Sequence, residues 1–354
     1  MASPVIPHSR PTIGDKEISA LTDVLRSGQV AQGPRVEAFE RGLAALLEVQ
    51  GGVAVSSGTV ALELALLALG VGPGDEVILP SYVCAAPWLA AVRVGARPRI
   101  VDIEPDTFAI DPAGAEKALS PRTRAVIVPH PFGLPADLSR LQGLGVPLIE
   151  DCAQTLGATE QGRQVGSVGQ VAICSFYATK LLCTGEGGML LSNDAEVLDK
   201  ARALREYDEQ PMLEAAAFNR KMTELQAAMG LQQLAQFQFF LDRRARIAVR
   251  YQAAFATTGL VLPSIPEGRT HVFYRYVVRV PPSGPSLDEV LARLERRGVQ
   301  CRRPVFRPLH RYLDLEGFPE SEQANASALS VPLYPSMTDE EVTRTIHTVG
   351  EELL

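Results

Sequence analysis

Lys180 is the first charged residue in the stretch SFYATKLLCTGEGGM, which covers residues 175–189. An apolar run typical of a strand leads into this stretch, and a cluster of three glycines follows the lysine. Burial lowers the pKa of a lysine and so supplies a free amine, the group that imine formation with carbonyl compounds requires. A lysine that only extends its ammonium from a strand end into water fits the same letters. The stretch by itself leaves both interpretations open.

An acidic residue, Asp151, lies in the segment EDCAQ (150–154), directly after the apolar run VPLI. This order places a carboxylate at the carboxyl end of a predicted buried strand. A buried carboxylate needs a cation or hydrogen bonds, because burying it unpaired is very costly. A protonated ring nitrogen of a cofactor is one such partner. A nearby arginine or a role as a helix cap is the structural alternative.

Ser57, Gly58 and Thr59 lie where a predicted strand ends and a predicted helix begins. Free backbone N–H groups, hydroxyls and the positive end of the helix dipole together favour a phosphate at such a place. An ordinary N-cap formed by Ser57 or Thr59 explains the same residues.

These three features together are what pyridoxal phosphate requires of a protein. Its aldehyde needs an amine, its pyridine nitrogen an acid, and its phosphate a helix N-terminus. The motifs of competing cofactors are missing: the chain has no G-x-G-x-x-G after a strand and no G-x-x-x-x-G-K-[ST]. The combination therefore favours pyridoxal phosphate over a dinucleotide or a nucleoside triphosphate.

The elements that must position these residues alternate between short apolar strands and helices. We predict strands at 52–56, 76–79, 99–101, 125–128, 147–149, 172–176 and 189–191, and helices at 15–27, 36–47, 59–69, 87–94 and 112–119. Such alternation predicts an α/β fold with a mainly parallel central sheet covered by helices on both faces. Ligands of such sheets bind at the carboxyl ends of the strands.

The second part of the chain has a different pattern. We predict helices at 196–206, 222–255 and 287–297, strands at 274–280 and 299–303, and a final helix opened by the capping-box pattern at Thr338. The long helix is suited to link two domains. We therefore expect a large domain over residues 1–240 and a smaller C-terminal α+β domain over residues 241–354.

Composition narrows the class of protein. The chain has 354 residues, a formal net charge of −7 and no long basic run, so we expect no nucleic-acid partner. We expect no signal peptide, because the N-terminal residues lack a basic segment followed by an apolar core, and no apolar run reaches membrane-spanning length. Five irregularly spaced cysteines suit reduced thiols in a cytoplasmic protein, and the histidines show no metal-ligand spacing, so we expect no metal.

Six segments follow one another along the chain: SSGTVALELALLALGVGPGDEVILP, PSYVCAAPWLAAVRVGARPRIVDIEPDTFAID, EDCAQTLGA, SFYATKLLCTGEGGM, FNRKMTELQAAMGLQQL and LSVPLYPSMTDEEV. In this order they closely resemble the DegT/DnrJ/EryC1/StrS family of aminotransferases, over essentially the whole chain. The resemblance implies an aspartate-aminotransferase-like type I fold and a homodimer whose active sites are shared across the interface. It also implies pyridoxal 5'-phosphate as the cofactor and keto-sugars, mostly nucleotide-linked, as acceptors.

The resemblance also assigns roles to individual residues. It implies that Lys180 forms the imine with the cofactor and that Asp151 pairs with the pyridinium nitrogen. The other implied contacts are Gln154 with the phenolic oxygen, Ala153 with one ring face, Ser57, Gly58, Thr59 and Ser175 with the phosphate, and Asn219 with the phosphate of the neighbouring subunit.

Two positions depart from the pattern of the family. Many members have an aromatic residue at the position of Cys84, where it stacks on the other face of the ring, so a smaller thiol contact is expected here. Trp88 lies four residues later and is better explained as a core aromatic. Lys221 stands where arginine is common and keeps the charge.

The expected activity is the transfer of an amino group from an amino acid, by resemblance glutamate, to a keto-sugar, with pyridoxamine phosphate as the intermediate form of the cofactor. Acceptor contacts are expected from the irregular segment 206–218 and from the stretch 302–310, whose arginines suit a diphosphate. The alternatives are an unlinked cyclitol ketone as acceptor, a cofactor-binding regulatory or scaffold protein without turnover, and a dehydrogenase. Lys180 argues against the related sugar dehydratases, which have histidine at its position.

Overall fold

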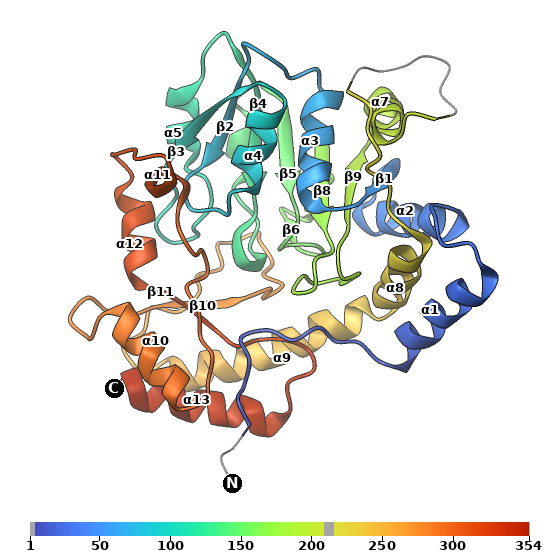
Figure 1. Cartoon of the computed structure of the whole chain (residues 1–354). Helices are drawn as coiled ribbons and strands as arrows, with labels where there is room; N and C mark the ends of the chain where they lie inside the picture. Colours follow the sequence, from blue (N-terminus) through green and yellow to red (C-terminus); the bar gives the residue numbers. More distant parts are fainter. Residues whose placement is uncertain (1–3, 209–215, 354) are drawn as a thin grey trace.

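The computed structural model describes residues 4–208 and 216–353. A seven-stranded sheet with the order β1-β9-β8-β5-β4-β2-β3 forms its centre (Figure 1). Its strands are β1 (Gly51–Val55), β2 (Glu76–Pro80), β3 (Arg97–Val101), β4 (Thr123–Pro129), β5 (Leu148–Asp151), β8 (Val171–Ser175) and β9 (Gly188–Ser192). Only β9 runs antiparallel to its neighbours. The predicted α/β class and the mainly parallel sheet are therefore confirmed.

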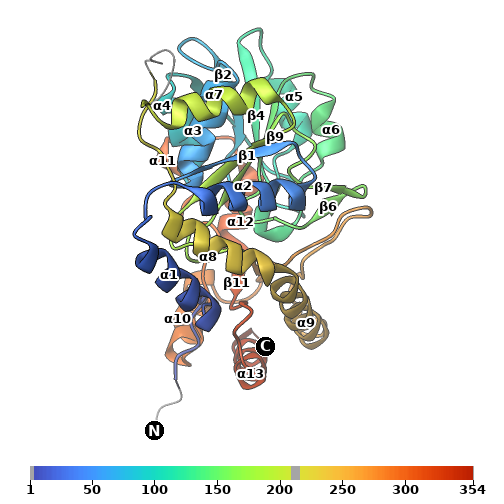
Figure 2. The same ribbon diagram turned by 90° about the vertical axis from the view of Figure 1, so that its right-hand side faces the viewer.

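Helices cover both faces of this sheet. One face carries α3 (Gly58–Ala68), α4 (Ala86–Arg93) and α7 (Ala195–Arg205), and the other carries α2 (Pro34–Leu47), α5 (Pro112–Ala118), α6 (Leu138–Gln142) and α8 (Glu224–Ala235). Successive strand residues alternate between the two cores: Val53 and Val55 pack beneath α3, whereas Ala54 packs beneath α2. Figure 2 shows the layers from the side.

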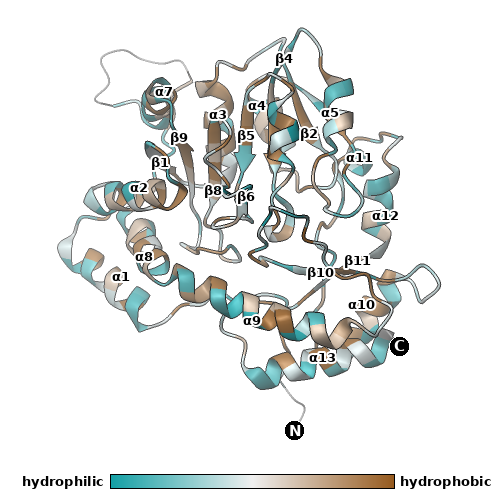
Figure 3. Cartoon of the chain, turned by 180° about the vertical axis from the view of Figure 1, so that it is seen from behind, coloured by the Kyte–Doolittle hydropathy of each residue, from teal (hydrophilic) through white to brown (hydrophobic). Residues whose placement is uncertain are grey.

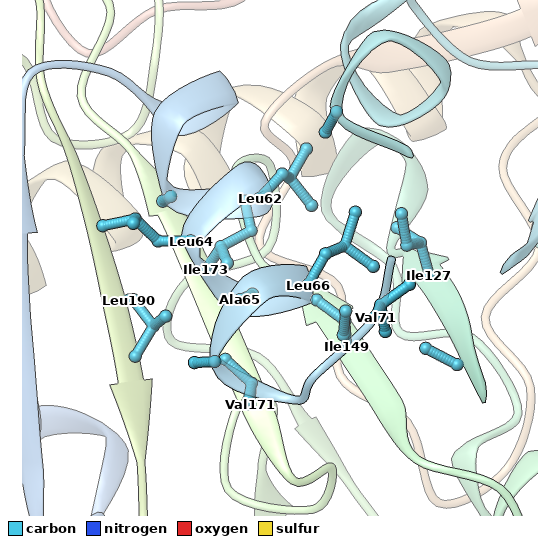
Figure 4. Packing of buried hydrophobic residues seen from close by; sticks show 14 of the residues in the cluster. Leu62, Leu64, Ala65, Leu66, Val71, Ile127, Ile149, Val171, Ile173 and Leu190 are labelled. Carbon is cyan, nitrogen blue, oxygen red and sulfur yellow. The ribbon is translucent and has the colours of Figure 1, made fainter. Parts of the chain in front are cut away.

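Helix α3 is apolar on nearly every side because it is enclosed. Its residues Leu62, Leu64 and Leu66 lie in the same cluster as strand residues such as Ile149 and Ile173 (Figure 4). Figure 3 shows α3, β8 and β9 as mostly hydrophobic, whereas the outer helix α12 (Pro319–Ser327) is mostly hydrophilic. The burial of α3 fixes its N-terminus against the carboxyl edge of the sheet.

A second hydrophobic core lies below the central sheet in Figures 1 and 2. Its elements are α9 (Phe237–Phe255), β10 (Tyr276–Arg279), α10 (Leu287–Arg296), β11 (Ala328–Val331) and α13 (Asp339–Leu353). Ile6 joins this core through backbone hydrogen bonds with Gly298 and Gln300. Phe237 packs in the large core and Ile247 in the second one, so α9 connects the two. We keep the division near residue 240 as a proposal.

The remaining elements are short or peripheral. They are α1 (Asp15–Ser27), the 3-10 turn at Pro131–Gly133, α11 (Leu309–Tyr312) and the hairpin of β6 (Thr159–Glu160) and β7 (Arg163–Gln164). No described helix combines the length and the apolar composition needed to cross a membrane.

Two predicted elements are wrong in detail. The predicted helix over 222–255 is two helices, because the backbone leaves helical geometry at Gln236 (φ −107°, ψ 4°). The predicted strand over 299–303 is only two isolated bridges, Val299 with Ile6 and Arg302 with Ser330. In both segments the apolar pattern fits the predicted element. Packing against neighbouring segments interrupts the helix and keeps the strand from pairing continuously.

Candidate active site

Asp151 and Ser175 end the neighbouring parallel strands β5 and β8 on the same face of the sheet. Ile149 and Ile173, two residues before them, both pack in the core beneath α3. Because side chains alternate along a strand, Asp151 and Ser175 also face the side of α3. The carboxyl ends of parallel strands meet at one edge, so both side chains lie beside the N-terminus of that helix.

The N-terminus of α3 approaches the strands as closely as the backbone permits. A Cβ atom on Gly58 would lie 2.7 Å from Ser175 Cβ, and one on Gly188 would lie 2.3 Å from the Ser57 carbonyl group. Only glycine allows these two approaches. Ser57 caps the helix, its Oγ accepting a hydrogen bond from Val60 N at 3.2 Å. The ordinary cap is therefore present, and the first turn, which includes Thr59, is held beside Ser175 in the arrangement that favours a phosphate.

Lys180 lies in the loop that connects β8 with β9. The loop is closed by a hydrogen bond from Phe176 N to Gly187 O at 2.9 Å, and Lys180 N donates to Tyr177 O at 2.8 Å. The Lys180 side chain is half-buried, and its Nζ lies 5.4 Å from the centre of the Tyr274 ring. The sequence contained no signal for Tyr274, which belongs to the segment preceding β10.

Asp151 is electrostatically coupled to Lys180. Burial raises the pKa of the Asp151 carboxyl, and the Lys180 ammonium acts in the opposite direction. The carboxylate Oδ1 also accepts a hydrogen bond from Ala153 N at 3.0 Å. A cationic N–H group placed against this carboxylate would lower its pKa further, so carboxylate and cation would stabilise each other.

Gln154 has a fixed orientation. Its Oε1 accepts a hydrogen bond from Phe132 N at 2.9 Å, because a backbone N–H can face only the oxygen of the amide. The –NH₂ end is therefore the end that can donate to a ligand oxygen. This orientation suits the predicted hydrogen bond of Gln154 with the phenolic oxygen of the cofactor, which stays a prediction.

Glu150 points to the opposite face from Asp151 and has a different environment. Its carboxylate accepts hydrogen bonds from Gly166 N and Val168 N at 2.8 Å and from Gly169 N at 2.6 Å. His130 lies 3.2 Å away and donates through Nε2, since its Nδ1 accepts from Ala136 N. Burial would raise the pKa of Glu150, but these hydrogen bonds hold it below its usual range.

His130, Glu150 and Cys152 are the one group of His, Cys, Asp and Glu within the described ranges whose ligand atoms lie within 4.8 Å of one another. The hydrogen bonds of Glu150 and His130 already occupy them, and burial raises the pKa of the Cys152 thiol. The group is therefore explained as packing of the strand ends.

Asn219 lies beside the N-terminus of α3, in a segment that is hydrogen-bonded to the end of β1. Arg220 O accepts from Ser56 N at 2.8 Å, and Arg220 Nη2 pairs with the buried Glu63 at 2.6 Å. Lys221 bridges the backbone of Val55. The Asn219 side chain is exposed, so it is available to a second subunit.

Cys84 and Trp88 differ in exposure. Cys84 is exposed in the turn before α4, whereas Trp88 in α4 is partly buried against the core beneath α3. The structure thus gives Trp88 the packing role that was predicted. The predicted contact of Cys84 with a cofactor ring stays a prediction.

The stretch 302–310 is largely occupied by other contacts. Arg303 pairs with Asp288 at 2.6 Å, and the buried His310 is held between Ser81 and Glu322. Arg307 donates to the Arg311 carbonyl oxygen. These side chains are committed to structure, which weakens the acceptor role predicted for the stretch. The other predicted acceptor segment, 206–218, lies partly outside the described residues.

His8 and His271 are half-buried, and both are held neutral. Burial, with Arg275 and Arg302 nearby, lowers the pKa of His8 from 6.5 to about 3, and burial lowers that of His271 from 6.5 to about 3. A histidine of the unfolded chain binds a proton below about pH 6.5, whereas these two bind one in the folded protein only below about pH 3. Between these pH values the unfolded chain therefore binds more protons than the folded protein. We therefore expect the free energy of unfolding to fall by about 1–2 kcal/mol per histidine between about pH 7.5 and about pH 5.

Urea unfolding at the two pH values measures this loss. The double substitution His8→Gln and His271→Gln should flatten the pH dependence, whereas His347→Gln, on the exposed side of α13, should leave it as in the wild type. An unchanged slope in the double variant would contradict the assignment.

The site as a whole fits pyridoxal phosphate. A half-buried carboxylate, an amine that interacts with it electrostatically and a glycine-lined helix N-terminus lie at one edge of the sheet. Fold and site define a pyridoxal-phosphate-dependent enzyme of the type I fold. The chain belongs to the DegT/DnrJ/EryC1/StrS aminotransferase family, which matches residues 11–350.

Known proteins match the chain along nearly its full length. The spore coat polysaccharide biosynthesis protein SpsC of Bacillus subtilis (strain 168) is 36% identical, over 98% of this chain and 96% of its own. The aminotransferase TlmJ from Streptoalloteichus hindustanus has a similar structure, with a TM-score of 0.94, 35% identity and 99% of each chain covered. DesI, solved in the presence of its TDP-sugar product, has a TM-score of 0.92 and 29% identity, over 99% of this chain and 93% of its own. The protein is thus an aminotransferase of a sugar aminotransferase family, and its cofactor is pyridoxal phosphate.

Proposed function

We propose that this enzyme transfers an amino group from L-glutamate to a nucleotide-linked keto-sugar in aminosugar biosynthesis. The observation that carries the proposal is the electrostatic interaction of the half-buried Asp151, at the end of β5, with Lys180 in the loop after the neighbouring strand β8. Turnover requires an amine that can move a proton and an acid that keeps the ring nitrogen protonated, and the site holds both. The regulatory or scaffold alternative is therefore disfavoured.

Each residue of the site has a task in this proposal. When bound, pyridoxal phosphate supplies a ring that stabilises the carbanion left by proton loss from the donor. Lys180 takes the α-proton of the donor and later returns a proton, acting as a general base and then as a general acid. Asp151 keeps a proton on the ring nitrogen, and Gln154 donates to the phenolic oxygen. Ser57, Gly58, Thr59 and Ser175 bind the phosphate, while Ala153 and Cys84 lie against the ring.

The donor half of the reaction tests the proposal directly. Without any acceptor, L-glutamate should convert the bound cofactor to its pyridoxamine form and release one 2-oxoglutarate per site. The change in visible absorption and enzymatic determination of 2-oxoglutarate measure both products. A protein that binds the cofactor but leaves glutamate unchanged would exclude glutamate as donor, and failure with every amino acid would favour the regulatory alternative.

The acceptor is proposed by analogy with relatives such as DesI. A panel of UDP-, dTDP- and GDP-linked keto-sugars, with an unlinked cyclitol ketone beside them, would identify it. Turnover of the cyclitol alone would contradict the nucleotide-linked proposal. Arg302 remains the candidate for a diphosphate, because Arg303 is paired with Asp288 and Arg307 donates to the Arg311 carbonyl oxygen.

We also propose a homodimer in which Asn219 reaches the phosphate of the neighbouring subunit. The support is its exposed side chain, held next to the N-terminus of α3 by the contacts of Arg220. Sedimentation analysis of the active enzyme tests the dimer, and a fully active monomer would exclude it. The five cysteines, all free in the structure, accord with the proposed cytoplasmic location.

A further inference from the structure

Two cations contact the ring of Tyr274, a buried residue that precedes β10. Lys180 Nζ lies 5.4 Å from the ring centre, and the guanidinium carbon of Arg275 lies 5.2 Å from it. Both distances are within the range of cation–π attraction, which grows when the cation is shielded from water. Within the described ranges no carboxylate oxygen lies within 4.0 Å of Lys180 Nζ. The negative face of the Tyr274 ring therefore attracts this amine where no carboxylate is close enough to pair with it.

The backbone of Tyr274 is held rigidly. The buried Arg244 of α9 donates through Nη1 to Tyr274 O at 3.1 Å, to Phe273 O at 3.2 Å and to Leu333 O at 3.1 Å. The Tyr274 hydroxyl lies 3.4 Å from Thr179 Oγ1, in the residue before the lysine. The ring is thus tied both to the C-terminal core and to the loop of Lys180.

The second cation is fixed by the N-terminal segment. Arg275 Nη1 lies 2.9 Å and 3.1 Å from the two ring nitrogens of His8, whose Nε2 is also 2.8 Å from Ser330 Oγ. Because its pKa is lowered to about 3, His8 stays neutral and offers a lone pair to Arg275. A continuous series of contacts therefore runs from His8 through Arg275 and the Tyr274 ring to Lys180.

We propose that Tyr274 is a positioning residue that holds the protonated amine of Lys180 at its ring when the lysine is not bonded to the cofactor. The inference rests on the proposed function, because it assumes that Lys180 is the amine that bonds the cofactor and moves the proton. Attraction to the fixed ring keeps the ammonium beside the loop of Lys180 and prevents the side chain from rotating into solvent. Lys180 is then already close to the position from which it bonds to the cofactor.

The groups around Tyr274 also give it an unusual titration. Burial would raise the pKa of its phenol, but Lys180 and Arg275 lead the effects that lower the pKa to about 8. Arg244 and the Thr179 hydroxyl act in the same direction. The apoprotein, in which Lys180 is not bonded to the cofactor, should therefore show one tyrosine that ionises near pH 8, well below the usual value of 10.

Two substitutions separate the ring from the hydroxyl. Tyr274→Phe keeps the ring, so it should keep kcat within about threefold while the titration near pH 8 disappears. Tyr274→Leu removes the ring, so it should lower kcat about ten- to thirtyfold with little change in KM for the donor. It should slow the uptake of pyridoxal phosphate by the apoprotein to a similar extent, which is a readout independent of turnover. Tyr276→Leu is the matched control, since Tyr276 is a buried neighbour that packs on Tyr251 in the C-terminal core.

Fluorinated phenylalanines at position 274 keep the experiment decisive if Tyr274→Leu does not fold. They preserve the shape of the ring but weaken its attraction for cations, so both rates should fall stepwise with fluorine content. Rates that do not change along this series, or Tyr274→Leu with wild-type rates, would overturn the inference. A Tyr274→Phe variant as impaired as Tyr274→Leu would overturn it too. Lys180→Ala tests the proposed function separately, so the two failures are distinguishable.

Discussion

Lys180→Ala should abolish turnover and the visible absorption of the lysine-bound cofactor. We expect a loss of about 10⁴-fold or more, because the substitution removes both the covalent link and the group that moves the proton. Lys180 is half-buried in a loop that is closed by backbone hydrogen bonds, so the shorter side chain should leave the fold intact. Steady-state kinetics and absorption spectra of the purified variant measure the two losses.

Two controls make this result specific. Lys200→Ala changes an exposed lysine on α7 and should retain wild-type activity. Borohydride reduction of the wild-type enzyme, followed by peptide mass analysis, should place the cofactor on Lys180. Substantial activity in Lys180→Ala, or attachment at another lysine, would contradict the assignment of the catalytic residue.

Asp151→Asn should lower kcat by about 10²–10³-fold while the cofactor remains bound at Lys180. The amide has the shape of the carboxylate but no charge, so it cannot hold a proton on the ring nitrogen during the reaction, and losses of this size are typical when one preorganised electrostatic contact is removed. The backbone contact from Ala153 N to Oδ1 can persist, and burial already raises the pKa of this carboxyl, so the variant should be nearly as stable as the wild type. Kinetics and thermal unfolding measure the two effects separately.

Glu150→Gln is the matched control on the same strand. Glu150 faces away from α3 and accepts three backbone hydrogen bonds, so an amide there should cost about 2–3 kcal/mol of stability. Its kcat should fall far less than that of Asp151→Asn. An Asp151→Asn variant with near wild-type kcat, or a reversed order of the two kcat effects, would refute the role of Asp151.

The alternation of strands and helices was predictable because it depends on short-range patterns. Apolar runs of three to five residues between helical segments place each strand within a few residues of its observed bounds. Period-2 alternation also implies that Glu150 and Asp151 face opposite sides of the sheet. The break between α8 and α9 at Gln236 was not predicted. The helical pattern continues across it, and only packing between the two cores imposes the break.

The candidate site was predictable only as far as its motifs are local. Ser57, Gly58 and Asp151 each stand at a strand end or a helix start, where the surrounding letters predict their place, and Lys180 follows in the loop after such a strand. The close approach of Gly188 to Ser57 was not predictable, because it depends on which strands become neighbours. The pairing of Arg303 with Asp288 was hidden for the same reason, since it joins segments with no shared pattern.

The amino-acid sequence by itself determined the α/β class, the resemblance to the aminotransferase family and the three groups that a pyridoxal phosphate site requires. Only the tertiary structure decided that Asp151 and Ser175 share the face of α3 and that Tyr274 meets Lys180. The physical reason is the range of the interactions. Strand and cap patterns are written in neighbouring residues, whereas the surroundings of an amine depend on how the C-terminal core packs against the sheet.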